Sequence, residues 1–399
     1  MIYDFDHLPN RHLTESVKWR TYGNDVLPLW VADMDFASPQ PVIQALHERV
    51  EHGVFGYPPG NSPGSLPVLR QLIVERLAER YDWLVQPDDI LFQPGVANGF
   101  KLACLAFASP DKAALVQTPV YQPILEAATT TGVLGREAEL IRNPDGFYLV
   151  DYDAFEAAIA DRTSLFILCN PHNPVGRVFH REELERMAEI CLRHGVVICS
   201  DEVHCELLYS DQRHLPIASL DTQIARNTVT LMSPSKTFNL AGLKFSFAIV
   251  QNPELRQRYL HAGYGMAGLA SLMGYVAAEA AYKDGQEWLD QLLVYLEANR
   301  ELVYSFIQTE MPEISLARPE GTYLAWLDCR QAGMEGNPYE FFLKEARVAL
   351  NDGATFGRAG EGFVRLNFGC PRHILEEALV RMKNAILKTE SAHRRRFLG

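Results

Sequence analysis

The sequence predicts an α/β protein built around a mostly parallel β-sheet. Short apolar runs that suit buried strands recur along the middle of the chain, at Ala113–Val116, Leu165–Cys169, Val196–Cys199, Val229–Leu231 and Phe247–Val250. Helical patterns around 121–131, 152–160 and 181–194 separate the first three of these runs. Continuous apolar strands with helices between them are typical of a parallel sheet that helices cover on both faces.

The flanking regions predict further helices and a second, smaller unit. Ser38 and Pro39 precede an amphipathic pattern that reaches Val50, so we expect a helix with a serine cap and a proline in its first turn. A second amphipathic helix is expected over 66–77, and a long one from about 286 to 310. Beyond the long helix, a smaller α+β unit is expected from Tyr323–Leu327, Phe341–Ala346 and Phe363–Asn367.

The length of the chain suggests two domains. A chain of 399 residues is long for a single domain. The first 45 residues have no sheet partner of their own, so we place residues 1–45 with the C-terminal unit, 286–399. Residues 46–285 would then form the large domain, with the long helix as the boundary.

Composition and charge favour a globular cytoplasmic protein. The chain is 47% hydrophobic and 22% charged, which is ordinary for a protein with a large core. Its net charge of −13 provides no positive field for phosphates, so we expect no nucleic-acid partner. The N-terminal stretch lacks the basic start and apolar run of a signal peptide, and no apolar run is long enough for a membrane span.

The cysteines point to a reducing compartment. There are seven of them, an odd number, scattered along the chain without a C-x-x-C pair. This pattern argues against a disulfide framework and against a zinc knuckle, and we expect no metal site.

Polar side chains follow three of the predicted strands at the point where each strand ends. Asn173 follows the run that ends at Cys169, Asp201 follows the run that ends at Cys199, and Lys236 follows the run that ends at Leu231. In open parallel sheets, ligands bind beyond the carboxyl ends of the strands, so we expect these three side chains to converge. Upstream, the segment Gln93–Gly99 leads into a helix whose free N–H groups suit an anion.

Each of these features alone has a plain structural explanation. Asn173-Pro174 suits a turn, and Asp201 suits a helix cap or a salt bridge. The loop at Gly95 suits simple entry into a helix, since it matches neither G-x-G-x-x-G nor a Walker sequence.

Together, the features suit a cofactor that has a pyridine nitrogen, a phenolic oxygen, an aldehyde and a phosphate. Such a cofactor needs a carboxylate, an amide, an amine, and hydroxyls with N–H groups. In that order, the chain offers Asp201, Asn173, Lys236, and Ser233 and Ser235 with the Gly95 loop. Lys236 would be a nucleophile, and a nearby cationic site would lower its pKa below the free value of roughly 10.4.

The chain resembles the fold-type I pyridoxal-phosphate enzymes of the class I/II aminotransferase superfamily, and within it the cystathionine β-lyase (C–S lyase) group of the MalY and PatB type. The resemblance covers nearly the whole chain and is carried in order by PLWVADMDF (28–36), FGYPP (55–59), TPVY (118–121), NPHNPVGR (170–177), SDEVH (200–204), SPSKTFNLAG (233–242) and VRLNFGCPR (364–372). It implies a mostly parallel seven-stranded sheet in a large domain, a smaller domain from both termini, and pyridoxal 5′-phosphate as the cofactor.

The resemblance also implies roles around the cofactor. Lys236, Asp201 and Tyr121 would be the catalytic residues, with Tyr121 stacked on the pyridine ring, although a core tyrosine after a turn would look the same. Tyr57 resembles the tyrosine that reaches the phosphate of a neighbouring subunit, which implies a homodimer with shared active sites. The remaining cofactor contacts would come from the loop at Gly95, Val96 and Ala97, from Ser233 and Ser235, and from His204 and Lys244.

On the substrate side, the resemblance points to Ala32, Asn173 and Arg365. Arg365 would pair bidentately with the substrate α-carboxylate, a geometry that lysine cannot reproduce, although an arginine on an edge strand is the plain alternative. One departure concerns the phosphate. Many aminotransferases carry arginine two residues after the glycine that follows the catalytic lysine, whereas Lys244 stands at that position here and would make only a point contact.

Three functions remain open from the sequence. The first is β-elimination from cystathionine or another cysteine-S-conjugate, which gives a thiol, pyruvate and ammonia. The second is transamination on the same scaffold. The third is a pyridoxal-phosphate-binding or partner-binding protein without turnover, which the intact set of Lys236, Asp201, Asn173 and Arg365 disfavours. The lyase is preferred on the resemblance, including His204 where many aminotransferases carry tyrosine. The sequence does not identify the group on the thiol side of the substrate.

Overall fold

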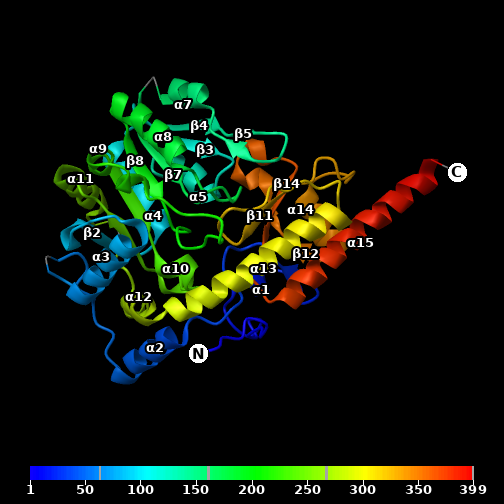
Figure 1. The fold of residues 1–399 in the computed structure, drawn as a ribbon, viewed down its shortest axis with the longest axis horizontal. Helices are drawn as coiled ribbons and strands as arrows, with labels where there is room; N and C mark the ends of the chain where they lie inside the picture. The colour runs from blue at the N-terminus through cyan, green and yellow to red at the C-terminus, as the bar shows by residue number, and fades with distance from the viewer. Residues whose placement is uncertain (63, 160–161, 266–267, 398–399) are drawn as a thin grey trace.

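The computed structural model describes residues 1–62, 64–159, 162–265 and 268–397, and its centre is a seven-stranded sheet (Figure 1). The strand order is β2-β10-β9-β8-β7-β3-β4. The bounds are β2 (Ile90–Gln93), β3 (Ala113–Thr118), β4 (Gly135–Glu139), β7 (Thr163–Cys169), β8 (Val197–Asp201), β9 (Thr228–Met232) and β10 (Ser246–Ile249). Within this sheet, β10 runs in the direction opposite to the other six strands, so the predicted mostly parallel α/β sheet is confirmed.

Helices cover both faces of this sheet. Alternate residues of β7 face opposite sides: Leu165 and Ile167 pack with α4 (Val96–Phe107) and α11 (Pro253–Gly263), whereas Phe166 and Leu168 pack with α7 (Tyr152–Ile159) and α8 (Arg181–Arg193). Because both faces are buried, the inner strands are largely apolar rather than alternating.

Two strands of this sheet were not predicted from the sequence, for different reasons. The edge strand β4 has the sequence GREAE and is largely exposed, so it carries no apolar run. The other edge strand, β2, is buried but only four residues long, ILFQ. A short apolar run of this kind cannot be assigned by periodicity alone.

The helix predicted after Ser38 forms, but its cap is different. The helix α2 (Gln40–His52) begins after Pro39 and has no side-chain cap. The predicted serine cap is wrong, because Ser38 Oγ donates instead to Asn239 O at 3.2 Å. The helix predicted around 121–131 is divided into α5 (Gln122–Leu125) and α6 (Ala127–Thr130).

The C-terminal part contains a small antiparallel sheet of order β11-β14-β13, with β11 (Leu324–Asp328), β13 (Asn351–Asp352) and β14 (Phe363–Asn367). The long helices α13 (Gln286–Glu310) and α15 (Arg372–Phe397) lie side by side next to it (Figure 1, yellow and red). The predicted long helix is confirmed. Of the three segments expected in the smaller α+β unit, 323–327 and 363–367 contribute β11 and β14, and 341–346 contributes a π-helical turn, Phe342–Ala346.

The N-terminal segment reaches this C-terminal part through a short parallel pair. The strand β1 (Leu27–Pro28) pairs with β12 (Val348–Ala349). The domain boundaries at residues 45 and 285 nevertheless stay a prediction. The remaining elements are α1 (Val17–Arg20), α3 (Pro67–Tyr81), α9 (Thr222–Arg226), α10 (Pro234–Thr237), α12 (Leu272–Asp284), α14 (Pro338–Phe341), β5 (Ile141–Arg142) and β6 (Tyr148–Leu149).

All seven cysteines are free and buried. Among the helices of the described residues, none combines the length and the apolar character that crossing a membrane requires.

Candidate active site

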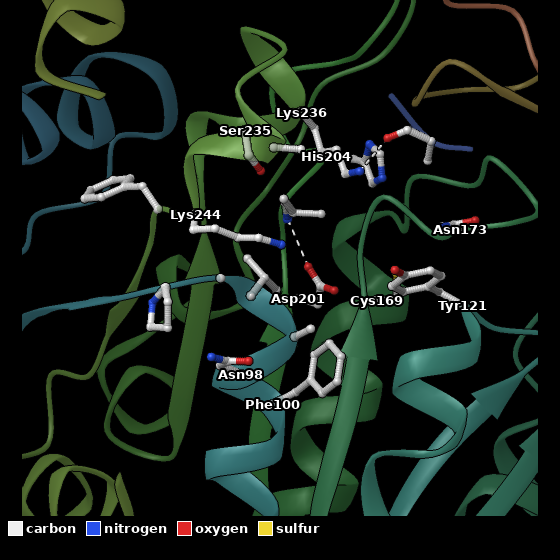
Figure 2. Close-up of a pocket in the computed structure, with 18 residues that line it drawn as sticks. Asn98, Phe100, Tyr121, Cys169, Asn173, Asp201, His204, Ser235, Lys236 and Lys244 are labelled. Atoms are coloured by element: carbon white, nitrogen blue, oxygen red, sulfur yellow. Dashed lines mark hydrogen bonds between the residues drawn. The ribbon is translucent and has the colours of Figure 1, made fainter. Parts of the chain in front are cut away.

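A cavity of about 330 Å³ lies at the carboxyl edge of the large sheet (Figure 2). The strand register explains its position, because Cys169 pairs with Asp201 and Asp201 pairs with Leu231, so β7, β8 and β9 end together. The cavity is lined by Ala32, Pro94, Gly95, Val96, Ala97, Asn98, Phe100, Tyr121, Cys169, Asn173, Asp201, Val203, His204, Ser235, Lys236, Ala241, Lys244 and Phe245. The expected convergence of Asn173, Asp201 and Lys236 is therefore found.

Lys236 lies on α10, directly after β9, and is held by the N-terminal segment. Its Nζ donates to Ala32 O at 2.5 Å. Burial lowers the pKa of Lys236 to about 8; Asp33 and Asp201 oppose this shift, and Arg365 and Lys244 add to it. The sequence interpretation credited a cationic site with the shift, but the larger cause is burial.

Asp201 ends β8 at the centre of the cavity (Figure 2). Burial raises the pKa of this carboxyl from its ordinary 3.8 to about 7, against the N–H of Val203, which donates to Oδ1 at 3.1 Å, and the charge of Lys236. A buried carboxyl of this kind ionises readily only when a hydrogen-bond donor or a cation contacts it. It is therefore suited to hold a protonated ring nitrogen.

The start of α4 forms an anion cradle at the other end of the cavity. The N–H groups of Val96 and Ala97 lie in the first turn of the helix and have no acceptor within it. The backbone at Gly95 is extended (φ 167°), and a Cβ built there would meet no protein atom within 4 Å. The backbone therefore does not require glycine at this position, and a side chain there would take up room beside the free N–H groups.

Ser235 and Lys244 line the same cavity, and the side chain of Lys244 points into it (Figure 2). Lys244 has a left-handed backbone (φ 53°), which is uncommon for a residue other than glycine. The lysine is thus placed where a second positive group can face an anion.

His204 and Tyr121 line the cavity as predicted. The imidazole of His204 is buried against Tyr323 in an edge-to-face contact with ring centroids 5.9 Å apart. Burial lowers the pKa of His204 well below its ordinary value, and its Nδ1 has no hydrogen-bond partner in the described chain. Tyr121 is tied to Asn173 through its N–H, which donates to Asn173 O at 3.0 Å.

Three predicted site residues do not line this cavity, namely Ser233, Tyr57 and Arg365. Ser233 is used locally: its Oγ caps α10 by accepting from Ser235 N at 3.0 Å and donates to Phe245 O at 2.6 Å. The structure therefore gives no support to Ser233 as a phosphate ligand. Tyr57 is 99% exposed, and within one chain it contributes nothing to the cavity.

Arg365 lies behind the cavity wall, on β14. Its guanidinium donates to Asn173 Oδ1 at 2.9 Å, to Trp30 O at 2.9 Å and to Asn351 Oδ1 at 2.5 Å. Burial lowers the pKa of Arg365 to about 10, and its Nε meets no partner among the described residues. The arginine thus contacts the cavity through Asn173 and retains an unused donor.

Sequence reasoning missed several residues of this site. Asn98 and Phe100 follow the Gly95 loop on the first turns of α4, and helical spacing could have indicated them. Tyr323 donates its hydroxyl to Ala32 O at 2.9 Å, and no local signal could have shown this contact across 291 residues.

Comparison with known proteins places the chain in a family. The aminotransferase class I and II family model matches residues 24–382, and the chain belongs to this family. Cystathionine beta-lyase PatB of Bacillus subtilis is 39% identical over 96% of this chain and 100% of its own length, and protein MalY of Escherichia coli is 32% identical over 96% and 99%. Cystalysin of Treponema denticola, whose crystal structure contains a pyridoxal 5′-phosphate cofactor, superimposes with a TM-score of 0.92 at 33% identity, covering 98% of this chain and 100% of its own. These similarities confirm the predicted type I fold and the predicted family.

The raised pKa of Asp201 predicts a pH-dependent stability. In the ligand-free protein an acid with a higher pKa in the folded chain than in the unfolded chain costs stability as the pH rises from about 4 to about 7. Asp201→Asn cannot ionise, so it should be more stable than wild type near pH 8 by on the order of 2 kcal/mol. Thermal unfolding should show this advantage shrinking toward pH 4.5. An advantage that does not change with pH would contradict the assignment.

Proposed function

We propose that this protein is a pyridoxal-phosphate-dependent carbon–sulfur β-lyase. It cleaves cystathionine or a related cysteine-S-conjugate, with water, to a thiol (homocysteine from cystathionine), pyruvate and ammonia. The observation that carries the proposal is the convergence of Lys236, Asp201 and Asn173 in one cavity, with Arg365 bonded to Asn173 behind it. The similarity to PatB and MalY over nearly the full length favours the lyase among the reactions of this family.

The residues of the cavity fit the cofactor. Asp201 is a buried carboxyl with room for a protonated ring nitrogen, and the free N–H groups of Val96 and Ala97 suit its phosphate. The unpartnered Nδ1 of His204 is a further polar atom that a bound group could satisfy. When bound, pyridoxal 5′-phosphate supplies an aldehyde for an amine and a ring that accepts negative charge from the substrate Cα.

Lys236 supplies the amine and the base. With a pKa of about 8, a useful fraction of this side chain is neutral near neutral pH, so it can accept and return a proton. Its bond to Ala32 O holds the amine at the edge of the cavity. Asp201 would hold the proton on the ring nitrogen of the bound cofactor, which would let the ring accept the negative charge that develops at the substrate.

Arg365 orients the substrate. Its planar guanidinium is fixed by Asn173, Trp30 and Asn351, and it would present its edge to the α-carboxylate. Tyr121 borders the same cavity on the side of Asn173 and offers an aromatic face for the ring (Figure 2). Held by its α-carboxylate in this way, a substrate would be oriented for departure of a thiolate from its Cβ.

Transamination is the second candidate, because the family that the chain belongs to is that of the class I and II aminotransferases. The two reactions share the removal of the Cα proton by Lys236 and differ afterwards. In a lyase the sulfur leaving group would depart from the substrate Cβ, whereas a transaminase would pass the amino group on to a 2-oxo acid.

The lyase is tested by product release from cystathionine without added keto acid. We expect pyruvate and free thiol to accumulate continuously over many turnovers, and Lys236→Ala to release neither. If product stops after one equivalent per site and resumes only when a 2-oxo acid is added, the enzyme is a transaminase.

We further propose that the protein works as a homodimer with shared active sites. The segment around Tyr57 presents a run of exposed apolar side chains, with Val54 60%, Phe55 59% and Tyr57 99% exposed. A neighbouring subunit would cover this run and receive the Tyr57 hydroxyl at its phosphate site. A reducing, cytoplasmic location suits the seven free cysteines.

Subunit mixing tests the shared site. Tyr57→Ala and Lys236→Ala should each have little activity as pure proteins. After exchange at equal amounts, the hybrid has one site with both residues intact, so activity should return to about a quarter of wild type. Mixing Asp201→Ala with Lys236→Ala is the matched control and should recover nothing, because both residues belong to one subunit's site. No recovery with Tyr57→Ala, or a monomeric mass, would contradict the proposal.

A further inference from the structure

Residues 30–36, which we call the strap, have no regular secondary structure, yet side chains from elsewhere bind their carbonyl groups. Asn367 Nδ2 donates to Val31 O at 2.5 Å and to Asp33 O at 2.7 Å. Arg365 donates to Trp30 O. An irregular, partly buried segment needs such partners, because its own backbone supplies little beyond the bond from Asp33 N–H to Val31 O at 2.9 Å.

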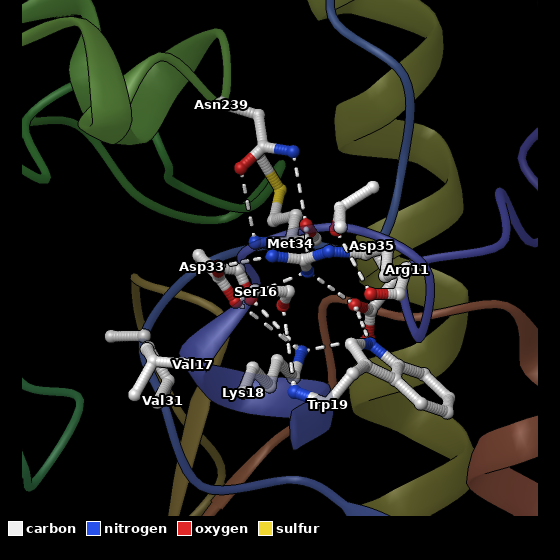
Figure 3. A network of polar contacts seen from close by, with 12 residues as sticks. Arg11, Ser16, Val17, Lys18, Trp19, Val31, Asp33, Met34, Asp35 and Asn239 are labelled. Carbon is white, nitrogen blue, oxygen red and sulfur yellow. Dashed lines mark hydrogen bonds and ion pairs between the residues drawn. The ribbon is translucent and has the colours of Figure 1, made fainter. Parts of the chain in front are cut away.

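Asn239 hydrogen-bonds three backbone atoms of the strap, two of them on Met34 (Figure 3). Its Oδ1 accepts from Met34 N at 3.1 Å, and its Nδ2 donates to Met34 O at 2.9 Å and to Phe36 O at 2.8 Å. Asn239 follows Lys236 by three residues and has a left-handed backbone (φ 58°), a conformation that asparagine tolerates. The turn that carries Lys236 is thereby fastened to the strap.

A buried ion network supports the strap from the opposite side (Figure 3). Lys18 is fully buried and donates to Asp35 Oδ2 at 2.7 Å and to Asp33 O at 3.0 Å. Arg11 bridges the two acids, at 2.7 Å to Asp33 and 2.6 Å to Asp35, and Trp19 Nε1 donates to Asp35 Oδ1 at 2.7 Å. Desolvation makes such a network expensive, and its geometric effect is to fix the strap in one position.

Ala32 connects the strap to the amine of Lys236. Ala32 O accepts from Lys236 Nζ and from Tyr323. The charged and titratable groups that act on Lys236 are Asp33 from the strap, Arg365 from β14, Asp201 from β8 and Lys244 after α10, with His204 beside them. Moving the strap would therefore change both the acceptor of the amine and one of its charged neighbours.

We propose that Asn239 is a positioning residue that fixes the Ala32 carbonyl as the acceptor for the free amino group of Lys236, with the Arg11–Asp33–Lys18–Asp35 network as its support. Asn239 acts through the strap and is not among the residues that line the cavity. The inference rests on the proposed function only in taking Lys236 as the reacting amine.

The test measures the amine directly. The full-length chain is freed of cofactor by dialysis against hydroxylamine, which takes up the aldehyde as an oxime, and then against buffer. It is labelled with acetic anhydride across pH 6–10, and the modification of Lys236 is quantified by peptide mass spectrometry. Asn239→Gly keeps the left-handed backbone and removes the three contacts. Without its acceptor the ammonium form is less favoured, so the labelling midpoint should fall by about one pH unit. Asn227→Ala is the matched control: its Nδ2 donates to Val196 O at 2.7 Å, away from the strap, and its midpoint should stay at the wild-type value.

Two results would overturn the proposal. One is an Asn239→Gly protein that is folded and labels with the wild-type midpoint, which would leave Asn239 a purely structural role. If Asn239→Gly does not fold, Asn239→Asp is the milder variant, since it retains the acceptor for Met34 N–H. The added charge of the aspartate would itself shift the labelling midpoint, so this variant is measured by hydrogen exchange instead. We expect the amides of the strap to exchange at least tenfold faster than in wild type. Unchanged protection would overturn the proposal equally. Neither readout depends on which reaction the enzyme catalyses.

Discussion

Burial of Asp201 and Lys236 at one edge of the large sheet is the constraint on which the rest of the site depends. Both groups lose water there, which moves the pKa of the acid up to about 7 and that of the amine down to about 8. The shifts bring both groups near neutral pH, where each can change its protonation state. The apolar strands that bury these groups also fix their separation, because β8 and β9 are adjacent and in register.

The site is assembled from segments that are remote in sequence. Arg365 on β14 bonds Asn173 after β7, and Lys236 after β9 bonds Ala32 near the N-terminus. These contacts join the C-terminal sheet and the N-terminal strap to the large sheet at the cavity itself. A substitution far from the cavity can therefore alter the chemistry if it moves the strap.

The sequence predicted those parts of the site that follow from local pattern. Asn173, Asp201 and Lys236 could be placed because each follows an apolar strand, and parallel strands present their carboxyl ends at one edge. The cap predicted at Ser38 is wrong, and Ser233 has local partners, because a hydroxyl next to a helix start serves a cap, a distant carbonyl or a ligand equally well, and only tertiary contacts decide among these. The contacts of Asn239 and Tyr323 could not be recognised from the sequence, since their partners are backbone groups of an irregular segment that has no sequence signature.

We propose that Lys236, and not its neighbour Lys244, is the amine that holds the cofactor. Both side chains reach the same cavity, so the distinction is a real one. Borohydride reduction of the cofactor-loaded protein, followed by peptide mapping, decides between them. We expect a pyridoxyl group on Lys236 and its loss from that peptide in Lys236→Ala. A pyridoxyl group on Lys244 in the wild-type protein would contradict it.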